Sequence, residues 1–283
     1  MSATIRLMEE RDIDFALAQT AREGWEIAPG GFQMHLDDDP DGCFIAEREG
    51  RPIAMITTTR YGRSAFMGNL IVEPSSRRQG VGEMLMRCAM DRLRQQGISR
   101  LALEADAPGV KLYRRLGFTD AFQSLRFEAM RPARPAAGEG REVEPLTADN
   151  LKEMARFDAH HFGDDRSRIL AALLPRAPAA LCLRRDGAPA GYIITQPLKG
   201  GVRLGPAVAI GAEAAAALID AVLARLDAAR FTAGVPAPNR DGARVLRARG
   251  FEPRTPCLRM VCGDEAYHGR PEHVLAIAGG DRG

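Results

Sequence analysis

The two halves of this chain repeat one another, which limits it to folds that can be built twice. The stretch 49–57, a Gly-Arg-Pro turn before an apolar run, aligns with 186–194, a Gly-Ala-Pro turn before another. At the same spacing Gly68 aligns with Gly205, and further on 113–118 aligns with 246–251, each ending in Gly-Phe. Matches at consistent spacing predict a duplicated domain whose second copy is a few residues shorter.

The chain is long enough for two such copies, because 283 residues accommodate two ordinary domains. Between the copies, 131–140 is dominated by Pro, Gly and Ala and carries no apolar period, as is typical of a linker. We therefore expect a first domain over 1–131, a linker over 132–141 and a second domain over 142–283.

Composition indicates a globular protein, with 45% apolar and 27% charged residues. A net charge of +2 with interspersed signs gives no reason to expect nucleic acid or a membrane surface as a partner. No secretory pattern opens the sequence, and five scattered cysteines complete no zinc-site spacing. We expect a cytoplasmic protein with reduced cysteines and no metal, either a monomer or a homodimer.

One stretch, 70–83, has the pattern of a strand, a basic glycine loop and a helix start. The apolar run ends in Val72, Arg77 and Arg78 follow, and Gly80 and Gly82 open an amphipathic helix. Free N–H groups and the helix dipole favour an anion at such a terminus, and glycines let it approach the backbone. The motif alone is equally compatible with an ordinary glycine turn and two solvated arginines.

The corresponding part of the second half, 209–215, contains an acid and no arginine. This predicts that the second copy kept the scaffold and lost the anion-binding loop. The remaining pattern predicts a strand, a helix capped by Asp12, a loop-like 25–40, and then further strands and helices. The expected strands are 3–7, 43–47, 53–60, 66–72, 101–105 and 122–130. The helix capped by Asp12 is expected to run to about residue 21, and two further helices are expected over 81–96 and 110–116.

Taken together, these motifs resemble the GNAT superfamily of N-acyltransferases. Arg77-x-x-Gly80-x-Gly82 after a strand is similar to its acetyl-CoA motif, and 112–118, Leu-Tyr-Arg-Arg-Leu-Gly-Phe, is similar to its second signature. The resemblance is strong over 3–130 and visible over 141–262. Asp158, Phe162-Gly163 and Asp165-Arg166 resemble the signature segment of the degenerate second domain in two-domain bacterial acetyltransferases.

The resemblance implies an α+β fold, an α/β/α sandwich: tandem GNAT domains, each with a mixed, mostly antiparallel sheet flanked by helices. It also implies that acetyl-CoA binds as a cosubstrate, without a metal. Its pantetheine arm would pair with the backbone of Leu70 and Val72 where two parallel strands splay apart, and its pyrophosphate would lie on the amides of 78–83. The cofactor-binding residues expected on this basis are Leu70, Ile71, Val72, Arg77, Arg78, Gln79, Gly80, Val81, Gly82, Glu83 and Asp106.

Tyr113 occupies the position of the family's general acid, which protonates the departing thiolate, although an aromatic packing role is the alternative. Asp106 stands where the family often has Asn. The sequence does not identify the general base, because Glu104 and Glu73 both border the expected site and either could be a structural or surface carboxylate. We take Glu104 as the candidate. The 37–39 Asp run is either a solvated loop or an attractor of a cationic amine, and Trp25 and Phe32 either contact substrate or belong to the core.

These expectations describe an acetyl-CoA-dependent N-acetyltransferase that moves an acetyl group to a primary amine of a small molecule by direct attack in a ternary complex. The alternative is a non-catalytic CoA or acyl-CoA sensor or assembly protein.

Overall fold

The computed structural model describes residues 3–133, 143–263 and 269–283, which form two compact units. Unit 1 contains 3–121, 260–263 and 280–283, and unit 2 contains 122–133, 143–259 and 269–279. From residue 134 on, the linker expected over 132–141 lies outside the described residues. No helix in the described ranges is both long and apolar enough to cross a membrane.

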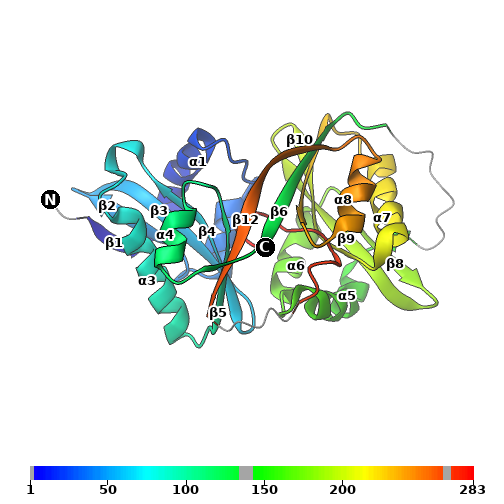
Figure 1. The fold of residues 1–283 in the computed structure, drawn as a ribbon, viewed down its shortest axis with the longest axis horizontal. Coiled ribbons are helices and arrows are strands. Elements are labelled where there is room, and N and C mark those ends of the chain that lie inside the picture. The colour runs from blue at the N-terminus through cyan, green and yellow to red at the C-terminus, as the bar shows by residue number, and fades with distance from the viewer. Residues whose placement is uncertain (1–2, 134–142, 264–268) are drawn as a thin grey trace. The chain divides into compact units, whose positions relative to one another are not determined.

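The sheet of unit 1 follows chain order (Figure 1), and its successive strands pair antiparallel except for the last two, which are parallel. The sequence predicted each of these strands to within two residues. They are β1 (Thr4–Leu7), β2 (Phe44–Arg48), β3 (Arg51–Arg60), β4 (Ser64–Val72) and β5 (Arg100–Ala105). The mixed, mostly antiparallel sheet with flanking helices confirms the expected α+β class.

The helices of unit 1 are α1 (Ile13–Arg22), α2 (Gly31–Asp38), α3 (Val81–Gln95) and α4 (Val110–Arg115). Asp12 precedes α1, but its side chain makes no capping bond to that helix and instead accepts from the Glu9 amide (2.9 Å) and from Arg6 (2.7 Å). The expectation of a loop throughout 25–40 was wrong, because Gly30 adopts a left-handed φ of 70° and starts α2, whose Phe32 and Leu36 enter the core. Phe32 therefore packs in the core, and Asp39, after α2, is buried against Arg60 (Nε–Oδ2 2.6 Å) rather than solvated.

The sheet of unit 2 runs from β6 through β11, β10, β9 and β8 to β7, with β13 added beside β10. Strands β10 and β11 pair in parallel. The strands are β6 (Thr119–Met130), β7 (Val143–Pro145), β8 (Ala180–Arg185), β9 (Ala188–Leu198), β10 (Gly201–Ala209), β11 (Arg230–Pro236), β12 (Glu252–Gly263) and β13 (Val274–Ala276). The helices are α5 (Ala148–Phe162), α6 (Ser167–Leu173), α7 (Gly211–Arg225) and α8 (Arg240–Arg247).

The last strand of each half groups partly with the other unit. The strand expected over 122–130 forms as β6, but it pairs with β11 of unit 2 from Ser124–Pro236 to Met130–Arg230. In return, the end of β12 lies in unit 1, where the Val261 carbonyl accepts a bond from Thr119 Oγ1 (3.3 Å) and Gly263 packs against the Ser99 carbonyl.

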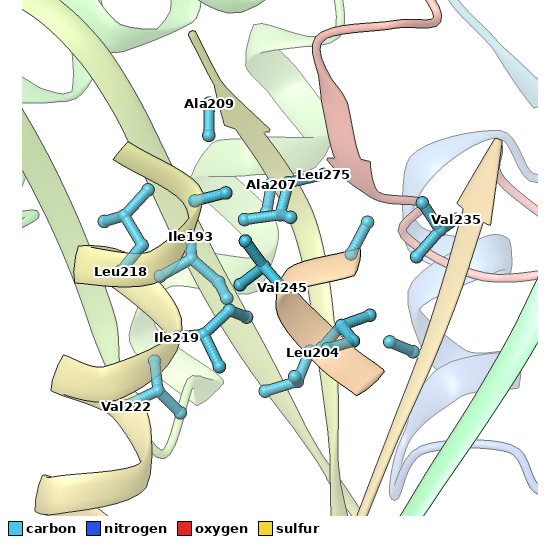
Figure 2. Close-up of a cluster of buried hydrophobic side chains, with 14 of the residues drawn as sticks. Ile193, Leu204, Ala207, Ala209, Leu218, Ile219, Val222, Val235, Val245 and Leu275 are labelled. Carbon is cyan, nitrogen blue, oxygen red and sulfur yellow. The ribbon is translucent and has the colours of Figure 1, made fainter. Parts of the chain in front are cut away.

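The core of unit 2 lies between its sheet and α7 with α8 (Figure 2). Leu218, Ile219 and Val222 repeat at helical spacing along α7 and face Ile193 and Leu204 of the sheet. All five side chains are buried, and burial of an aliphatic side chain of this size is worth about 1.5–3 kcal/mol. This apolar face, together with the high helix propensity of the alanines, explains why α7 forms.

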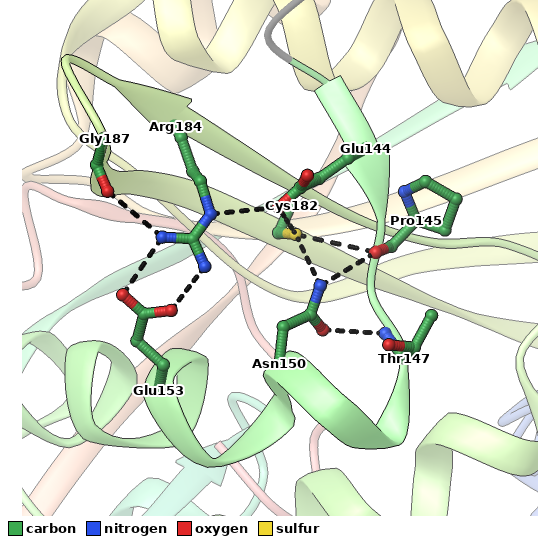
Figure 3. A network of polar contacts seen from close by, with 8 residues as sticks. All are labelled: Glu144, Pro145, Thr147, Asn150, Glu153, Cys182, Arg184 and Gly187. Carbon is green, nitrogen blue, oxygen red and sulfur yellow. Dashed lines mark hydrogen bonds and ion pairs between the residues drawn. The ribbon is translucent and has the colours of Figure 1, made fainter.

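A surface network ties α5 to the edge of the same sheet (Figure 3). Arg184 of β8 donates to Glu144 of β7 (Nε–Oε1 2.9 Å) and to Glu153 of α5 (Nη1–Oε1 3.0 Å). Asn150 accepts from the Thr147 amide at the helix start, which satisfies one amide that the helix leaves open (2.8 Å). These contacts fix where α5 begins.

A second, fully buried network contains the residues of the expected signature segment. Arg166 binds Asp158 through both carboxylate oxygens (2.7 and 2.9 Å), Tyr192 donates to Asp158 (2.6 Å), and Phe162 lies under the guanidinium (4.1 Å). Gly163 ends α5 with a left-handed φ of 92°. The segment is thus a structural element that holds α5 and α6 to β9.

Replacing Asp158 by Ala should lower the free energy of unfolding by about 3–5 kcal/mol, because Arg166 would remain buried with its charge uncompensated. Glu153→Ala is the control, since it breaks the exposed pair with Arg184 and should cost at most about 1 kcal/mol. Urea unfolding followed by circular dichroism measures both. Equal losses would contradict the assignment of the buried pair as the critical one.

Acid should destabilise unit 2 through His161. Burial, then the neighbouring His273, His160 and Arg270, lower the pKa of His161 to about 4, while Asp158 opposes the shift. The unfolded chain therefore takes up a proton near its ordinary pKa of about 6.5, before the native state does, so stability falls between about pH 6.5 and 4. Thermal midpoints at pH 7 and 5 should differ more in the wild type than in His161→Gln; equal differences would refute the role of His161.

Candidate cofactor-binding and catalytic site

In unit 1, β4 and β5 begin side by side and both continue past their common ladder. They pair in parallel from Ser64–Arg100 to Phe66–Ala102, whereas the strands run on to Val72 and Ala105. We call the two continuing arms the splay. The expected pantetheine-binding residues Leu70, Ile71 and Val72 all lie on its β4 arm. Ile71 is buried in the core, so only its backbone faces a ligand.

A bulge marks the foot of the β4 arm, and the sequence analysis missed it. Between the pairs Met55–Ile71 and Thr57–Gly68, one residue of β3 lies opposite two residues of β4. Asn69 takes a left-handed φ of 53°, and its side chain donates to Thr57 Oγ1 (3.0 Å). Gly-Asn inside a strand pattern was the available signal, because these residues tolerate such backbone angles. The bulge turns the backbone of β4 where the strands part.

After β4 the chain forms an exposed loop that ends at the start of α3. Gly80 precedes the helix with a left-handed φ of 82°, and no atom lies within 4 Å of the position that a Cβ would take. Arg78 is also left-handed, with φ 60°. The first amides of α3 have no intrahelical acceptor, since that is a property of every helix N-terminus. The loop therefore offers backbone donors and open space to an anion.

The other expected loop residues hold its shape. Arg77 donates to the Val72 carbonyl (Nε–O 2.8 Å) and pairs with Glu23. Gln79 donates to the Ser75 carbonyl (3.0 Å) and accepts from Arg48 (2.8 Å). Val81 is buried as the first residue of α3.

Two contacts bring α4, and with it Tyr113, to the same place. Glu83, in the first turn of α3, pairs with Arg87 (2.8 Å) and with Arg115 of α4 (3.5 Å), which lowers the pKa of its carboxyl. Gly82 lies on α3 facing Leu112 of α4, since a Cβ there would be 3.8 Å from its Cδ2. The cofactor loop and the second motif thus lie together.

Tyr113 packs on the backbone before its own helix. A Cβ on Gly109 would approach its ring to 2.7 Å, and Phe118 meets the ring edge-on with centroids 6.1 Å apart. Burial, then the charge of Asp106, raises the pKa of Tyr113 to about 12. The phenol therefore keeps its proton at neutral pH and has a hydrogen to donate.

The two carboxylates on the β5 side differ in placement. Glu104 is half-buried on the β5 arm of the splay, with its Oε2 atom buried. Asp106 follows the strand and accepts a bond from the Gly109 amide through its carbonyl (2.9 Å). Glu73 follows the β4 arm, where Arg22 pairs with it (3.5 Å).

Unit 2 has the same strands without this loop. A single residue, Ile210, separates β10 from α7, whereas β4 ends at Val72 and α3 begins at Val81. The chain itself fills the region between β10 and β11: β13 pairs with β10, and the Ile277 amide donates to the Gly234 carbonyl of β11 (2.8 Å). Asn239 also donates to the Val274 carbonyl (2.9 Å). A strand thus lies where unit 1 keeps its splay.

Comparison with known proteins finds a match in each half of the chain. The profile of the acetyltransferase (GNAT) family matches residues 6–118, and that of an acetyltransferase (GNAT) domain matches 154–276. Holothin acyltransferase of Pseudoalteromonas sp. is 23% identical over 259 residues, which cover 90% of this chain and 86% of that protein. Mycothiol acetyltransferase of Thermomonospora curvata is 32% identical over 101 residues, 33% of each chain.

Solved structures share the fold over nearly the whole length. A crystal structure from Pyrococcus horikoshii superposes with a TM-score of 0.83 at 24% identity and covers 99% of this chain and 96% of its own. A GCN5-related N-acetyltransferase from Sphaerobacter thermophilus gives a TM-score of 0.64 at 15% identity, covering 92% and 95%. With a matching profile in each half, the chain belongs to the GNAT family of acetyltransferases.

Proposed function

We propose that unit 1 binds acetyl-CoA and transfers the acetyl group to a primary amine of a small molecule, by direct attack in a ternary complex. The observation that carries this proposal is the combination of splay, Gly80 loop and Tyr113 in one unit. Unit 2 lacks the loop and fills the equivalent of the splay with β13, which supports one cofactor site per chain.

The residues present fit the cosubstrate. Gly80 gives the pyrophosphate open space beside the amides of 78–83, and the dipole of α3 adds positive charge there. The β4 arm offers the backbone of Leu70 and Val72 to the pantetheine amides. Arg77 contributes by shaping the loop, since its guanidinium already binds Val72 and Glu23. Asp106 lies beside Tyr113, and its negative charge helps to raise the pKa of the phenol.

Acetyl-CoA supplies an activated acyl group, and the chain must position it and manage two protons. A free thiol has a pKa of about 8.5, well below the value of about 12 for Tyr113, so complete proton transfer to the thiolate would be uphill. We therefore assign Tyr113 a hydrogen bond to the developing thiolate. Glu104, on the opposite arm of the splay, is the candidate to accept the proton that the attacking amine loses.

The proposal that the acceptor is a small molecule is based on the names of two relatives. The holothin and mycothiol enzymes are named for small molecules, and the former matches this chain over most of its length. A non-catalytic acyl-CoA sensor is the competing reading, and it predicts binding without turnover on any amine.

Replacing Gly80 by Glu should weaken acetyl-CoA binding more than about tenfold, because the side chain fills the open space and its charge repels the pyrophosphate. Gly50→Glu is the matched control, since Gly50 also has a left-handed φ (74°) with nothing within 4 Å of the Cβ position. Both variants should lose about 1–2 kcal/mol of stability from the backbone angle. Calorimetric titration measures the affinity for acetyl-CoA. Equal affinities of Gly80→Glu and wild type would refute the assignment of the Gly80 loop as the pyrophosphate site.

Replacing Tyr113 by Phe should lower kcat by about 100-fold and leave the affinity for acetyl-CoA little changed, because a donor to the developing charge is lost. The assay follows thiol release with an amine that the wild type acetylates, found by screening an amine panel. Tyr192→Phe is the control in unit 2 and should keep kcat. Unchanged kcat in Tyr113→Phe would remove its role, and tight binding of acetyl-CoA without turnover on any amine would favour the sensor.

A further inference from the structure

The segment 280–283 belongs to unit 1, although the residues before it belong to unit 2. Asp281 and Arg282 are 7% and 4% exposed. His35 of α2 binds Asp281 (Nε2–Oδ2 2.8 Å), Arg282 donates to the Gly31 carbonyl (2.9 Å), and the Tyr61 hydroxyl donates to the Arg282 carbonyl. The segment is therefore docked by side chains from α2 and from the end of β3.

The docked segment crosses β4 at the foot of the splay. A Cβ on Gly68 would lie 2.5 Å from the Cα of Asp281, so a side chain there would displace the segment. Gly68 directly precedes the bulge at Asn69 and stands two residues before Leu70, the first expected contact of the pantetheine arm. Segment 280–283 thus lies next to the place where the thioester would be held.

The face of the sheet is also defined. Gly68 pairs with Thr57, and Met55, which shares a face with Thr57 by strand alternation, packs among Phe32 and Leu36 of α2. The side chain of Ile71 also enters the cluster around α2. Val72, the next residue of β4, points to the other face, where Gly82 of α3 approaches it. The segment therefore lies on the α2 face, opposite α3 and its pyrophosphate loop.

The cosubstrate and the acceptor need different routes to one carbonyl carbon. With the pyrophosphate at the start of α3, as proposed above, the cosubstrate would approach from the α3 face, and the α2 face would be left for the acceptor. On that face, segment 280–283 stands at the foot of the splay.

We propose that segment 280–283 is the acceptor-side wall of the unit 1 site: it shields the thioester from water and limits the room for the acceptor. His35 is the positioning residue that holds this wall through Asp281. This inference rests on the proposed function and assigns the face that selects the acceptor.

The charges of the wall are satisfied within it. Burial, then the charge of Arg282, lowers the pKa of His35, while Asp281 opposes the shift. The His35 Nε2 atom lies 2.8 Å from Asp281 Oδ2, and the Arg282 guanidinium, 3.5 Å from the same oxygen, balances the charge of the carboxylate. A wall of this kind closes the site without leaving a bare charge beside the thioester.

The repeat supplies independent support. Gly205 of unit 2 aligns with Gly68, and a Cβ on Gly205 would lie 2.2 Å from the Ile277 carbonyl. The run that covers Gly68 is thus the continuation of the run that covers Gly205. In unit 2 it forms β13 and fills the space beside β10; in unit 1 it crosses β4 at Gly68, before the arm that carries Leu70 and Val72.

Acetyl-CoA hydrolysis without any amine tests the wall, because water then serves as the acceptor. Deleting 280–283 should raise thiol release, followed with a thiol reagent, by about tenfold, and Asp281→Asn should raise it a few-fold, as expected when water enters a closed site. Calorimetric affinity for acetyl-CoA should stay unchanged. Asp91→Asn, on an exposed turn of α3, is the matched control and should leave hydrolysis at the wild-type rate.

His35→Gln should match Asp281→Asn, and the double variant should add nothing further, because the two residues act as one pair. If the deletion fails to fold, Gly68→Ala, which pushes the segment away, and Asp281→Asn decide the question. Wild-type hydrolysis rates in variants that melt cooperatively and bind acetyl-CoA would overturn the wall. Failure of the wild type itself to bind acetyl-CoA would instead contradict the proposed function.

Discussion

The short parallel ladder between β4 and β5 is the constraint on which the site depends. Because it ends at Phe66 and Ala102 while both strands continue, β4 keeps one backbone edge for a ligand on the arm that carries Leu70 and Val72. The bulge at Asn69 and the left-handed turn at Gly80 lie on either side of that edge, and in the proposed function they direct it and the start of α3 toward one ligand. Neither feature alone would distinguish a binding site from an ordinary βα connection.

In unit 2 the corresponding pair of strands does not leave a free backbone edge. Its β10 and β11 also begin in parallel, but the connection to α7 is one residue and β13 supplies the missing partner along β10. Backbone groups that a ligand would satisfy in unit 1 are satisfied there by the chain itself, as buried polar groups require. In unit 2 the short connection to α7 and the pairing of β13 with β10 therefore occur together.

Local signals in the sequence predicted what is local in the structure. The alternating strands and the Gly80 loop appear where the pattern placed them, because alternation and glycine backbone angles act over a few residues. The helix α2 was missed because Pro and Gly residues before it and acids after it outweigh an apolar stripe of two turns. The pairing of β6 with β11 and the contact of His35 with Asp281 join residues far apart in the chain, which no local pattern encodes.

The two aligned glycines show how a repeat can reveal such distant contacts. Gly68 and Gly205 lie inside strands, where glycine weakens the strand and no turn requires it. A different reason must apply, and the structure gives the same one twice: a backbone passes too close for any side chain. A glycine that recurs within strands of both copies therefore indicates close approach by another segment. What it could not indicate is that both segments are parts of one continuous run of the chain.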